Sequence, residues 1–284
     1  MSCWESEGGG SMILVTQLPF YRIHEIDLYF LKNVEILKPE ESVIFVDNVY
    51  HEKQKEILKR ILPADVSVRY GNWRNRHEAW LDILSEFNSG DLVVIDSDNV
   101  VSPHFKKVLG LGEPVMGIMD GGAWDDERSR NEFLRRSRKA YEVDGIPIYK
   151  FTVINKGRGA FFFFGPKQAV VFRKFPDTEI LEKLRRALKN VNSWLMNIIT
   201  DETTLAVICH LMGIKETAWT VASRHYHHGS MKRDVKRDRF LIAMAHAQLA
   251  KGLAREFGQK EFKMYYWRYR LSQVRNFGDV ILCK

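Results

Sequence analysis

The sequence predicts an α/β protein with a doubly wound, mostly parallel sheet, helices on both faces and a helical C-terminal extension. Three observations support this fold class. From residue 12 to residue 98, short apolar runs alternate with longer amphipathic stretches. The runs are continuous, as in strands that are buried on both faces of a parallel sheet, and right-handed crossovers then give a doubly wound order. Beyond residue 234 the pattern is typical of helix instead.

The elements follow in order along the chain. In the first half we expect strands at 12–15, 42–46, 66–70 and 91–95, and helices at 23–37, 51–61 and 76–87. In the second half we expect strands at 114–119, 149–154 and 160–164, and helices at 126–139, 178–189, 202–212 and 235–257. An aromatic and basic stretch at 264–277 follows the last helix.

The composition is that of a soluble globular protein, with 45% hydrophobic and 28% charged residues in 284. It excludes a collagen-like chain, a disordered chain and a disulfide scaffold. No apolar run reaches the roughly 18 residues that would span a bilayer. The three cysteines lie far apart, without metal-type spacing. We therefore expect a reduced, cytoplasmic protein, peripheral to the membrane at most.

Three segments are expected along the chain. Residues 1–11 end in a Gly-Gly-Gly-Ser linker and are typical of a disordered extension or an expression scar. Residues 12–230 form the α/β domain, with a nucleotide-binding half at 12–101 and a second half at 102–230. Residues 231–284 form a basic helical extension.

The net charge of +7 is concentrated at the C-terminal end. Residues 231–284 contain 13 Lys and Arg against 5 Asp and Glu, whereas the remainder of the chain is nearly neutral. Such a segment can face phosphates, anionic lipid or nucleic acid. The solvated faces of a basic helix explain the same composition.

The strongest chemical signal is the pair of carboxylates in Asp96-Ser97-Asp98, directly after the fourth expected strand. Ligands of doubly wound sheets bind beyond the carboxyl ends of the strands. Two carboxylates there can hold a divalent cation, which would neutralise a diphosphate and make it a better leaving group. The alternative is an acidic turn that caps the next helix.

The same residues also fit a second motif. Asp96 to Val100 match the D-x-D-x-[TV] pattern of haloacid-dehalogenase-type phosphatases. In that family the motif ends the first strand, whereas here three strand–helix units precede it. A downstream G-D-x-x-x-D motif is also missing from the sequence, which argues against this interpretation.

Over most of its length the chain resembles glycosyltransferase family 2, which has the GT-A fold, and the motifs of the first half match in order. Val46-Asp47-Asn48 is similar to the V-D-D of that family, and Asn72–Asn75 stands where the family has a loop. Gly90–Asp98 resembles its G-D-hydrophobic-D-x-D segment, and Ser102-Pro103 follows where a proline is frequent. Each piece is modest, but their order and spacing strengthen the resemblance.

The second half adds an acidic motif. Gly157–Phe161 resembles a glycine-bearing segment on the acceptor side, and Thr200–Leu205 resembles the E-D-x-x-L motif of the family. In inverting members the second acid of that motif is the general base. The resemblance therefore assigns this role to Glu202, with Asp201 as the alternative. Two acids at a helix N-terminus also favour the helix dipole without any catalytic role.

A histidine-rich segment follows. Several members of the family have an H-x-H-x-x-G-like segment that touches the metal or the diphosphate. Here His225, His227 and His228 precede Gly229, so the histidine that would reach the metal is not specified. Imidazole is a common metal ligand. A zinc site is a weaker interpretation, because Cys209 and His210 lack paired spacing.

The C-terminal stretch from Met264 to Arg270, with Arg275-Asn276, resembles the Y-Y-x-x-R-N tail of the family. Aromatic residues interleaved with arginine can also stack on single-stranded nucleic acid or lie on a membrane surface. The resemblance favours packing together with an acceptor-facing or lipid-facing role.

Taken together, the resemblance implies metal-dependent, inverting transfer of a sugar from a nucleotide-sugar donor to a glycan, lipid-linked or protein acceptor. The implied ion is Mn²⁺ or Mg²⁺ on Asp98 and Asp96, with a histidine from the group above. The residues expected to bind the donor are Thr16, Pro19, Tyr21, Asp47, Asn75, Asp96 and Lys232.

The rival functions are a nucleotidyltransferase and a non-enzymatic protein that binds nucleic acid through the basic segment. A nucleotidyltransferase would be expected to have a glycine-rich loop after the first strand, whereas residues 16–22 contain no glycine. The near-neutral charge of the rest of the chain, together with its paired acids, argues against a protein that binds nucleic acid. Contact of residues 231–284 with an anionic membrane is expected as a further partner interaction.

Overall fold

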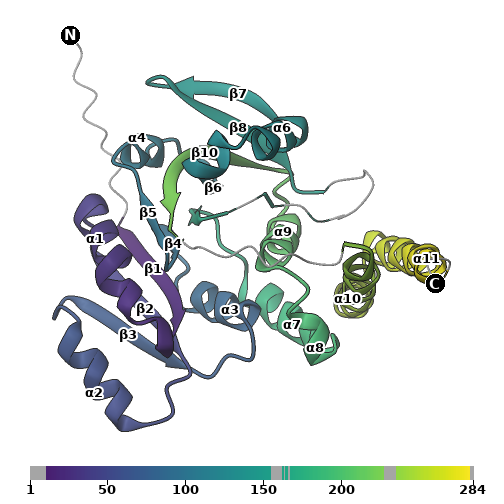
Figure 1. The fold of residues 1–284 in the computed structure, drawn as a ribbon, viewed down its shortest axis with the longest axis horizontal. Helices are drawn as coiled ribbons and strands as arrows, with labels where there is room; N and C mark the ends of the chain where they lie inside the picture. Colours follow the sequence, from purple (N-terminus) through teal and green to yellow (C-terminus); the bar gives the residue numbers. More distant parts are fainter. Residues whose placement is uncertain (1–10, 155–161, 163, 166, 227–234, 282–284) are drawn as a thin grey trace.

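The structure is a computed structural model. It describes residues 11–154, 162, 164, 165, 167–226 and 235–281, and the side chains of 123, 129, 235–238 and 276–281 are not part of that description. The described residues form one ten-stranded sheet with the order β3-β2-β1-β4-β9-β6-β10-β8-β7, and β5 pairs with β10 at its side. Figure 1 shows this sheet with helices around it.

The first half is built from four parallel strands joined by helices. The strands are β1 (Met12–Pro19), β2 (Glu41–Asp47), β3 (Val66–Gly71) and β4 (Asp91–Asp96), and the helical segments are η2 (Ile26–Phe30), α1 (Leu31–Leu37), α2 (Glu52–Ile61) and α3 (Arg76–Glu86). All neighbouring pairs in this half are parallel, with β1 between β2 and β4. The central residues of β1, β2 and β4 are buried without alternation, as in a sheet covered on both faces.

The second half extends the sheet through strands of mixed direction. β9 (Ala169–Phe172) lies antiparallel between β4 and β6 (Val115–Asp120), and β10 (Glu216–His225) lies parallel to β6. A hairpin of β7 (Ser137–Val143) and β8 (Ile146–Thr152) closes the far edge, and β5 (Asn99–Val101) pairs with the end of β10. The strands β1–β4, β6 and β10 therefore run in one direction, and the sheet is mainly parallel.

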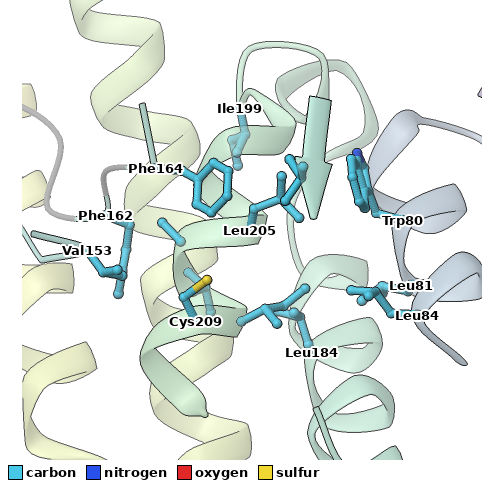
Figure 2. Close-up of a cluster of buried hydrophobic side chains, with 14 of the residues drawn as sticks. Trp80, Leu81, Leu84, Val153, Phe162, Phe164, Leu184, Ile199, Leu205 and Cys209 are labelled. Carbon is cyan, nitrogen blue, oxygen red and sulfur yellow. The ribbon is translucent and has the colours of Figure 1, made fainter. Parts of the chain in front are cut away.

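Two hydrophobic cores cover the two faces of the sheet. One core joins alternate residues of β1, β2 and β4 to α3, α7 (Thr178–Lys189), α9 (Asp201–Leu211) and the C-terminal helices. The other core joins the intervening strand residues to η2, α1, α2 and α4 (Phe105–Leu109). Figure 2 shows part of the first core, where side chains of α3, α7 and α9 meet. The predicted fold class, an α/β sheet with helices on both faces, is confirmed.

Several predicted boundaries are wrong. The helix expected at 126–139 is two short helices and a strand, α5 (Gly121–Asp125), α6 (Glu127–Arg136) and then β7, because Ser137–Val143 pair with β8. The first strand runs to Pro19, so Thr16 lies inside β1 and is buried. The strands β5, β9 and β10 and the short helix α8 (Ser193–Met196) were not predicted. Of the strand expected at 160–164, Phe162 forms an isolated bridge with Ile154.

The C-terminal residues form a helical hairpin of α10 (Val235–Phe257) and α11 (Lys260–Ile281), with the turn at Gly258 in a left-handed conformation (φ 68°). α10 packs closely on α7 at Gly252. A Cβ at this position would lie 2.6 Å from the carbonyl oxygen of Ala187, so the close approach requires glycine. Phe262 of α11 belongs to the same core as the sheet. The predicted boundary at residue 230 between the α/β domain and the C-terminal extension stays a prediction.

Among the described residues, no helix is both long enough and apolar enough to cross a membrane.

Candidate functional site

A cavity of about 580 Å³ opens at the carboxyl ends of β1, β2 and β4. Strand ends and the loops after them supply Pro19, Asp47 and Asp96, and the start of α3 supplies Arg76. Segments from the second half of the chain also line the cavity, and they contribute Lys167, Glu202 and His225 among other residues. The cavity therefore lies at the edge of the sheet where ligands of doubly wound folds bind.

Asp96, the last residue of β4, faces two cationic side chains. Its Oδ1 accepts from Arg76 Nη2 at 2.5 Å and lies 3.3 Å from Lys167 Nζ. The strand fixes the backbone of Asp96, since its N–H donates to the carbonyl of Gln168 next to β9. The first acid of the paired motif thus lines the cavity and is held there by cations from both halves of the chain.

Asp98 lies in the turn after β4 and pairs with a different arginine. Its Oδ2 accepts from Arg22 Nη2 at 2.8 Å and lies 3.4 Å from His225 Nε2. The antiparallel pairing of β5 with β10 places Asn99 opposite His225, which brings the imidazole to this turn. Burial would raise the pKa of Asp98, but the hydrogen bond from Arg22 and the charges of His225 and Arg22 lower it below its usual value. Asp98 is therefore ionised at neutral pH.

Asp201, the first residue of α9, is a buried ion-pair partner. Its Oδ2 accepts from Lys167 Nζ at 2.9 Å and from Trp80 Nε1 at 2.9 Å, and Arg76 Nε lies 3.8 Å away. Burial would raise the pKa of Asp201, but the charges of Lys167 and Arg76 lower it strongly. A carboxylate with these partners holds α9 against β4 and α3, and it is a poor proton acceptor.

Glu202, the next residue, has a pKa that is shifted in the opposite direction. It lines the cavity, whereas Asp201 does not. Burial raises the pKa of Glu202, the positive charge of Lys167 opposes the rise, and the negative charge of Asp201 adds to it; the result lies above the ordinary value. A carboxylate with a raised pKa in a cavity is suited to accept a proton from a substrate.

The other residues predicted from the sequence fall into three groups. Pro19, Tyr21, Asp47 and Asn75 line the cavity together with Asp96, Asp98, Glu202 and His225. Thr16 does not line it: the residue is fully buried and its hydroxyl donates to the carbonyl of Ile95 at 2.8 Å, so the expectation of donor contact is wrong for this side chain. His227, His228 and Lys232 lie outside the described residues. The roles of the lining residues and of the residues outside the described part of the chain stay predictions.

Two of the lining residues already have local partners. Asn75 is the N-cap of α3 and its Oδ1 accepts from the N–H of Glu78 at 3.1 Å. Asp47 Oδ1 accepts from the N–H of Asn48 at 2.7 Å, and Asn48 has a left-handed backbone (φ 61°). The second carboxylate oxygen of Asp47, Oδ2, accepts from Asn48 Nδ2 at 3.5 Å. These bonds fix the shape of the two loops, and the Nδ2 group of Asn75 can still donate to a ligand.

Sequence reasoning missed the cations of the site, Arg22, Arg76 and Lys167. Lys167 has only 2% of its side chain exposed and bridges Asp96 and Asp201, which are far from it in sequence. Its buried position could not be inferred from the sequence around it. Arg22 carries a weak signal, because it follows the first strand as ligand-binding residues of such folds do.

The expected Mn²⁺ or Mg²⁺ site can be tested against the donor atoms. The side chains of Asp98 and His225 are adjacent and provide oxygen and imidazole ligands, which suit these ions in kind. In the described part of the chain, however, no three His, Cys, Asp or Glu side chains are grouped to hold a metal ion. Metal binding thus stays a prediction.

The fold and the cavity define an α/β protein with an ionic binding site at the carboxyl edge of its sheet. The sequence matches no protein-family model, and no curated protein matches it. Solved structures with a similar arrangement include S. aureus TarS 1–349 in complex with UDP, with 13% identity over 88% of this chain and 72% of that chain and a TM-score of 0.42.

Two further structures have comparable scores. The galactosyltransferase LgtC in complex with donor and acceptor sugar analogs has 12% identity over 82% of this chain and 96% of that chain (TM-score 0.42). The inositol-1-phosphate CTP transferase from T. maritima has 10% identity over 84% and 97% (TM-score 0.45). Similarity at this level assigns no activity to the chain, so the functional argument rests on the residues of the cavity.

Proposed function

We propose that the protein is a glycosyltransferase that moves a sugar from a nucleoside-diphosphate sugar to an acceptor hydroxyl. One observation carries this proposal: Glu202, a carboxylate with a raised pKa, shares one cavity with the Asp96-Ser97-Asp98 turn and with Arg22 and Arg76. A proton acceptor and a set of groups for an anionic leaving group are the two parts that glycosyl transfer needs.

The nucleotide would lie across the ends of β1, β2 and β4. Pro19, Tyr21 and Asp47 line that side of the cavity and would contact the base and ribose. Tyr21 is 75% exposed, so its ring is free to cover a base that binds there. Asn75 lies at the N-terminus of α3, where backbone N–H groups favour anionic groups of a ligand.

The diphosphate would face the arginines. Arg22 and Arg76 use some of their N–H groups on Asp98 and Asp96, and a guanidinium has five N–H donors in all. Their side chains are 28% and 52% exposed, so further donors can reach phosphate oxygens. Bound at Asp98 and His225, Mn²⁺ or Mg²⁺ would neutralise charge on the departing diphosphate.

In the proposed transfer step, Glu202 accepts the proton and the nucleoside diphosphate takes the electron pair. Glu202 takes the proton of the acceptor hydroxyl as the acceptor oxygen forms a bond to the anomeric carbon. The bond from that carbon to the diphosphate oxygen breaks, and the nucleoside diphosphate leaves with the electron pair. Attack on the face opposite the leaving group inverts the configuration, by the geometry that also governs inverting glycosidases.

Donor turnover tests the proposal without knowledge of the acceptor. The wild-type protein is incubated with UDP-, GDP- and dTDP-sugars, and release of the nucleoside diphosphate to water or to simple sugar acceptors is measured. We expect one donor class to be consumed by the wild type and not by Glu202→Gln. Consumption of a nucleoside triphosphate and a sugar phosphate, with release of pyrophosphate, would instead identify a nucleotidyltransferase.

A further inference from the structure

The last described helix, α11, has two faces of different character. Phe262, Tyr265, Tyr269 and Gln273 are buried and face the rest of the protein. Phe262 and Tyr265 pack on Phe162 at ring-centroid distances of 5.9 and 5.1 Å. In Figure 1 α11 lies at the outer edge of the molecule, with α10 beside it, far from the β1–β3 edge of the sheet. On its other face, Met264, Trp267, Leu271 and Val274 are exposed in the described part of the chain.

That other face carries a row of exposed apolar side chains. Met264, Trp267, Leu271 and Val274 are 43%, 64%, 69% and 72% exposed. Their spacing of three, four and three residues places them in one stripe along the helix, about 180° from the buried face. Single exposed apolar residues are ordinary, whereas a continuous stripe marks an interaction site.

Basic side chains flank this stripe on both sides. At about 100° per residue, Lys263 and Arg270 lie along one flank and Arg268 and Arg275 along the other. All four are exposed, and Lys260 stands at the start of the helix. Glu261 is the one acidic residue of α11 within 260–275. The outward face is thus apolar along its centre and positively charged along its margins.

We propose that α11 binds the surface of an anionic lipid bilayer, with the stripe of Met264, Trp267, Leu271 and Val274 inserted among the lipid headgroups and the flanking Lys and Arg on lipid phosphates. An apolar face with tryptophan and leucine beside basic residues is the pattern of helices that lie in the membrane interface. Tryptophan favours the headgroup level, and long basic side chains extend from it to the phosphates.

The charge pattern favours a membrane over a second copy of the chain. A two-fold dimer through the stripe would bring the basic flanks of one helix against those of the other, because an isologous interface uses the same patch twice. An anionic leaflet instead attracts each of these residues. The proposal uses no residue of the cavity, so it does not depend on the proposed function.

Vesicle flotation with the full-length protein tests this inference. We expect the wild type to float with vesicles of phosphatidylcholine containing one third phosphatidylserine, and to bind pure phosphatidylcholine far less. Trp267→Ser combined with Leu271→Ser should weaken binding at least about tenfold, since both side chains would lose apolar burial. A matched control is Ile57→Ser combined with Ile61→Ser, which removes two exposed isoleucines of the basic helix α2 and should bind as the wild type does.

The charged flanks give a second, independent readout. Lys263→Gln and Arg275→Gln should each weaken binding to the anionic vesicles by roughly fivefold, and added salt should weaken the wild type in the same way. Circular dichroism and a denaturant titration confirm that each variant folds.

Three results would overturn the inference. The first is no binding of the wild type to anionic vesicles, and the second is equal binding to both kinds of vesicle. The third is a dimer in sedimentation equilibrium that Trp267→Ser with Leu271→Ser converts to a monomer, because the stripe would then be an interface between two copies of the chain.

Discussion

Lys167 Nζ lies 2.9 Å from Asp201 Oδ2 in an ion pair whose side chains are 2% and 9% exposed. The same nitrogen lies 3.3 Å from Asp96 Oδ1. One buried cation therefore ties the end of β4 to the N-terminus of α9. Of the two adjacent acids Asp201 and Glu202, only Glu202 lines the cavity. This contact explains why Asp201 is an ion-pair partner, whereas the adjacent Glu202 is the proposed proton acceptor.

Removal of this cation should destabilise the protein. In Lys167→Met, Asp96 and Asp201 lose a shared partner in a buried setting, and loss of one member of a buried pair costs about 3–5 kcal/mol. Equilibrium unfolding in denaturant measures the change in the free energy of unfolding. Lys139→Met, which breaks an exposed pair with Glu142, is the control and should change stability little. A Lys167→Met protein as stable as the control would contradict the structural role of the pair.

Neutralising the proposed base should slow turnover and spare binding. Glu202→Gln keeps the shape of the side chain but cannot accept a proton, and general-base assistance is worth about 10²–10⁴-fold in rate. We expect kcat to fall by that factor, whereas the Kd for the nucleoside diphosphate, measured by calorimetry, stays within about twofold. Full turnover by Glu202→Gln would remove Glu202 from the mechanism.

The pH profile should report the same residue. A base must be ionised to act, so activity is retained above the pKa of Glu202 and is lost as the pH falls through it. Because that pKa is raised from its usual 4.5, the acid limb of kcat/KM should lie above pH 4.5. Glu202→Gln should lose this limb while any residual activity stays flat in that range. An acid limb at the ordinary glutamate pKa would mean that the cavity does not perturb the group.

Metal dependence is tested through Asp98. If Asp98 and His225 hold Mn²⁺, the ion should tighten binding of a nucleoside diphosphate by the wild type and have no effect on Asp98→Ala. Calorimetric titrations with Mn²⁺ and with a chelator compare the two proteins. Equal affinity of the wild type in both conditions would refute the metal role. In that case the arginines Arg22 and Arg76 would be the groups that hold the diphosphate.

The sequence predicted the first half of the fold well, because its strands are buried on both faces and their apolar runs are continuous. It missed β10, whose sequence places Thr217, Thr220 and Ser223 among apolar residues and so hides a buried strand. It also missed β9, a run of four residues that becomes a strand only because β4 and β6 flank it. Tertiary context decides such segments more than local propensity does.

The candidate site divides in a similar way. Asp47, Asp96 and Asp98 were predictable because they follow apolar strands in a fold that binds ligands at that edge. Lys167 was not predictable, because its partner Asp96 lies 71 residues away and the contact exists only through the pairing of β4 with β9. Thr16 was expected to contact the donor just after a first strand ending at residue 15, whereas that strand continues to Pro19.

The most direct test of the account is calorimetric titration of the wild-type protein, Arg22→Met and Arg69→Met with UDP, GDP and dTDP. Arg22 lines the cavity, whereas Arg69 pairs with Glu86 outside it and serves as the control. We predict that one nucleotide binds the wild type and Arg69→Met alike, and binds Arg22→Met about 10- to 100-fold more weakly, as expected for loss of a charge-assisted hydrogen bond. Absence of binding to all three nucleotides, or equal binding by all three proteins, would contradict the claim that this cavity holds a nucleoside diphosphate.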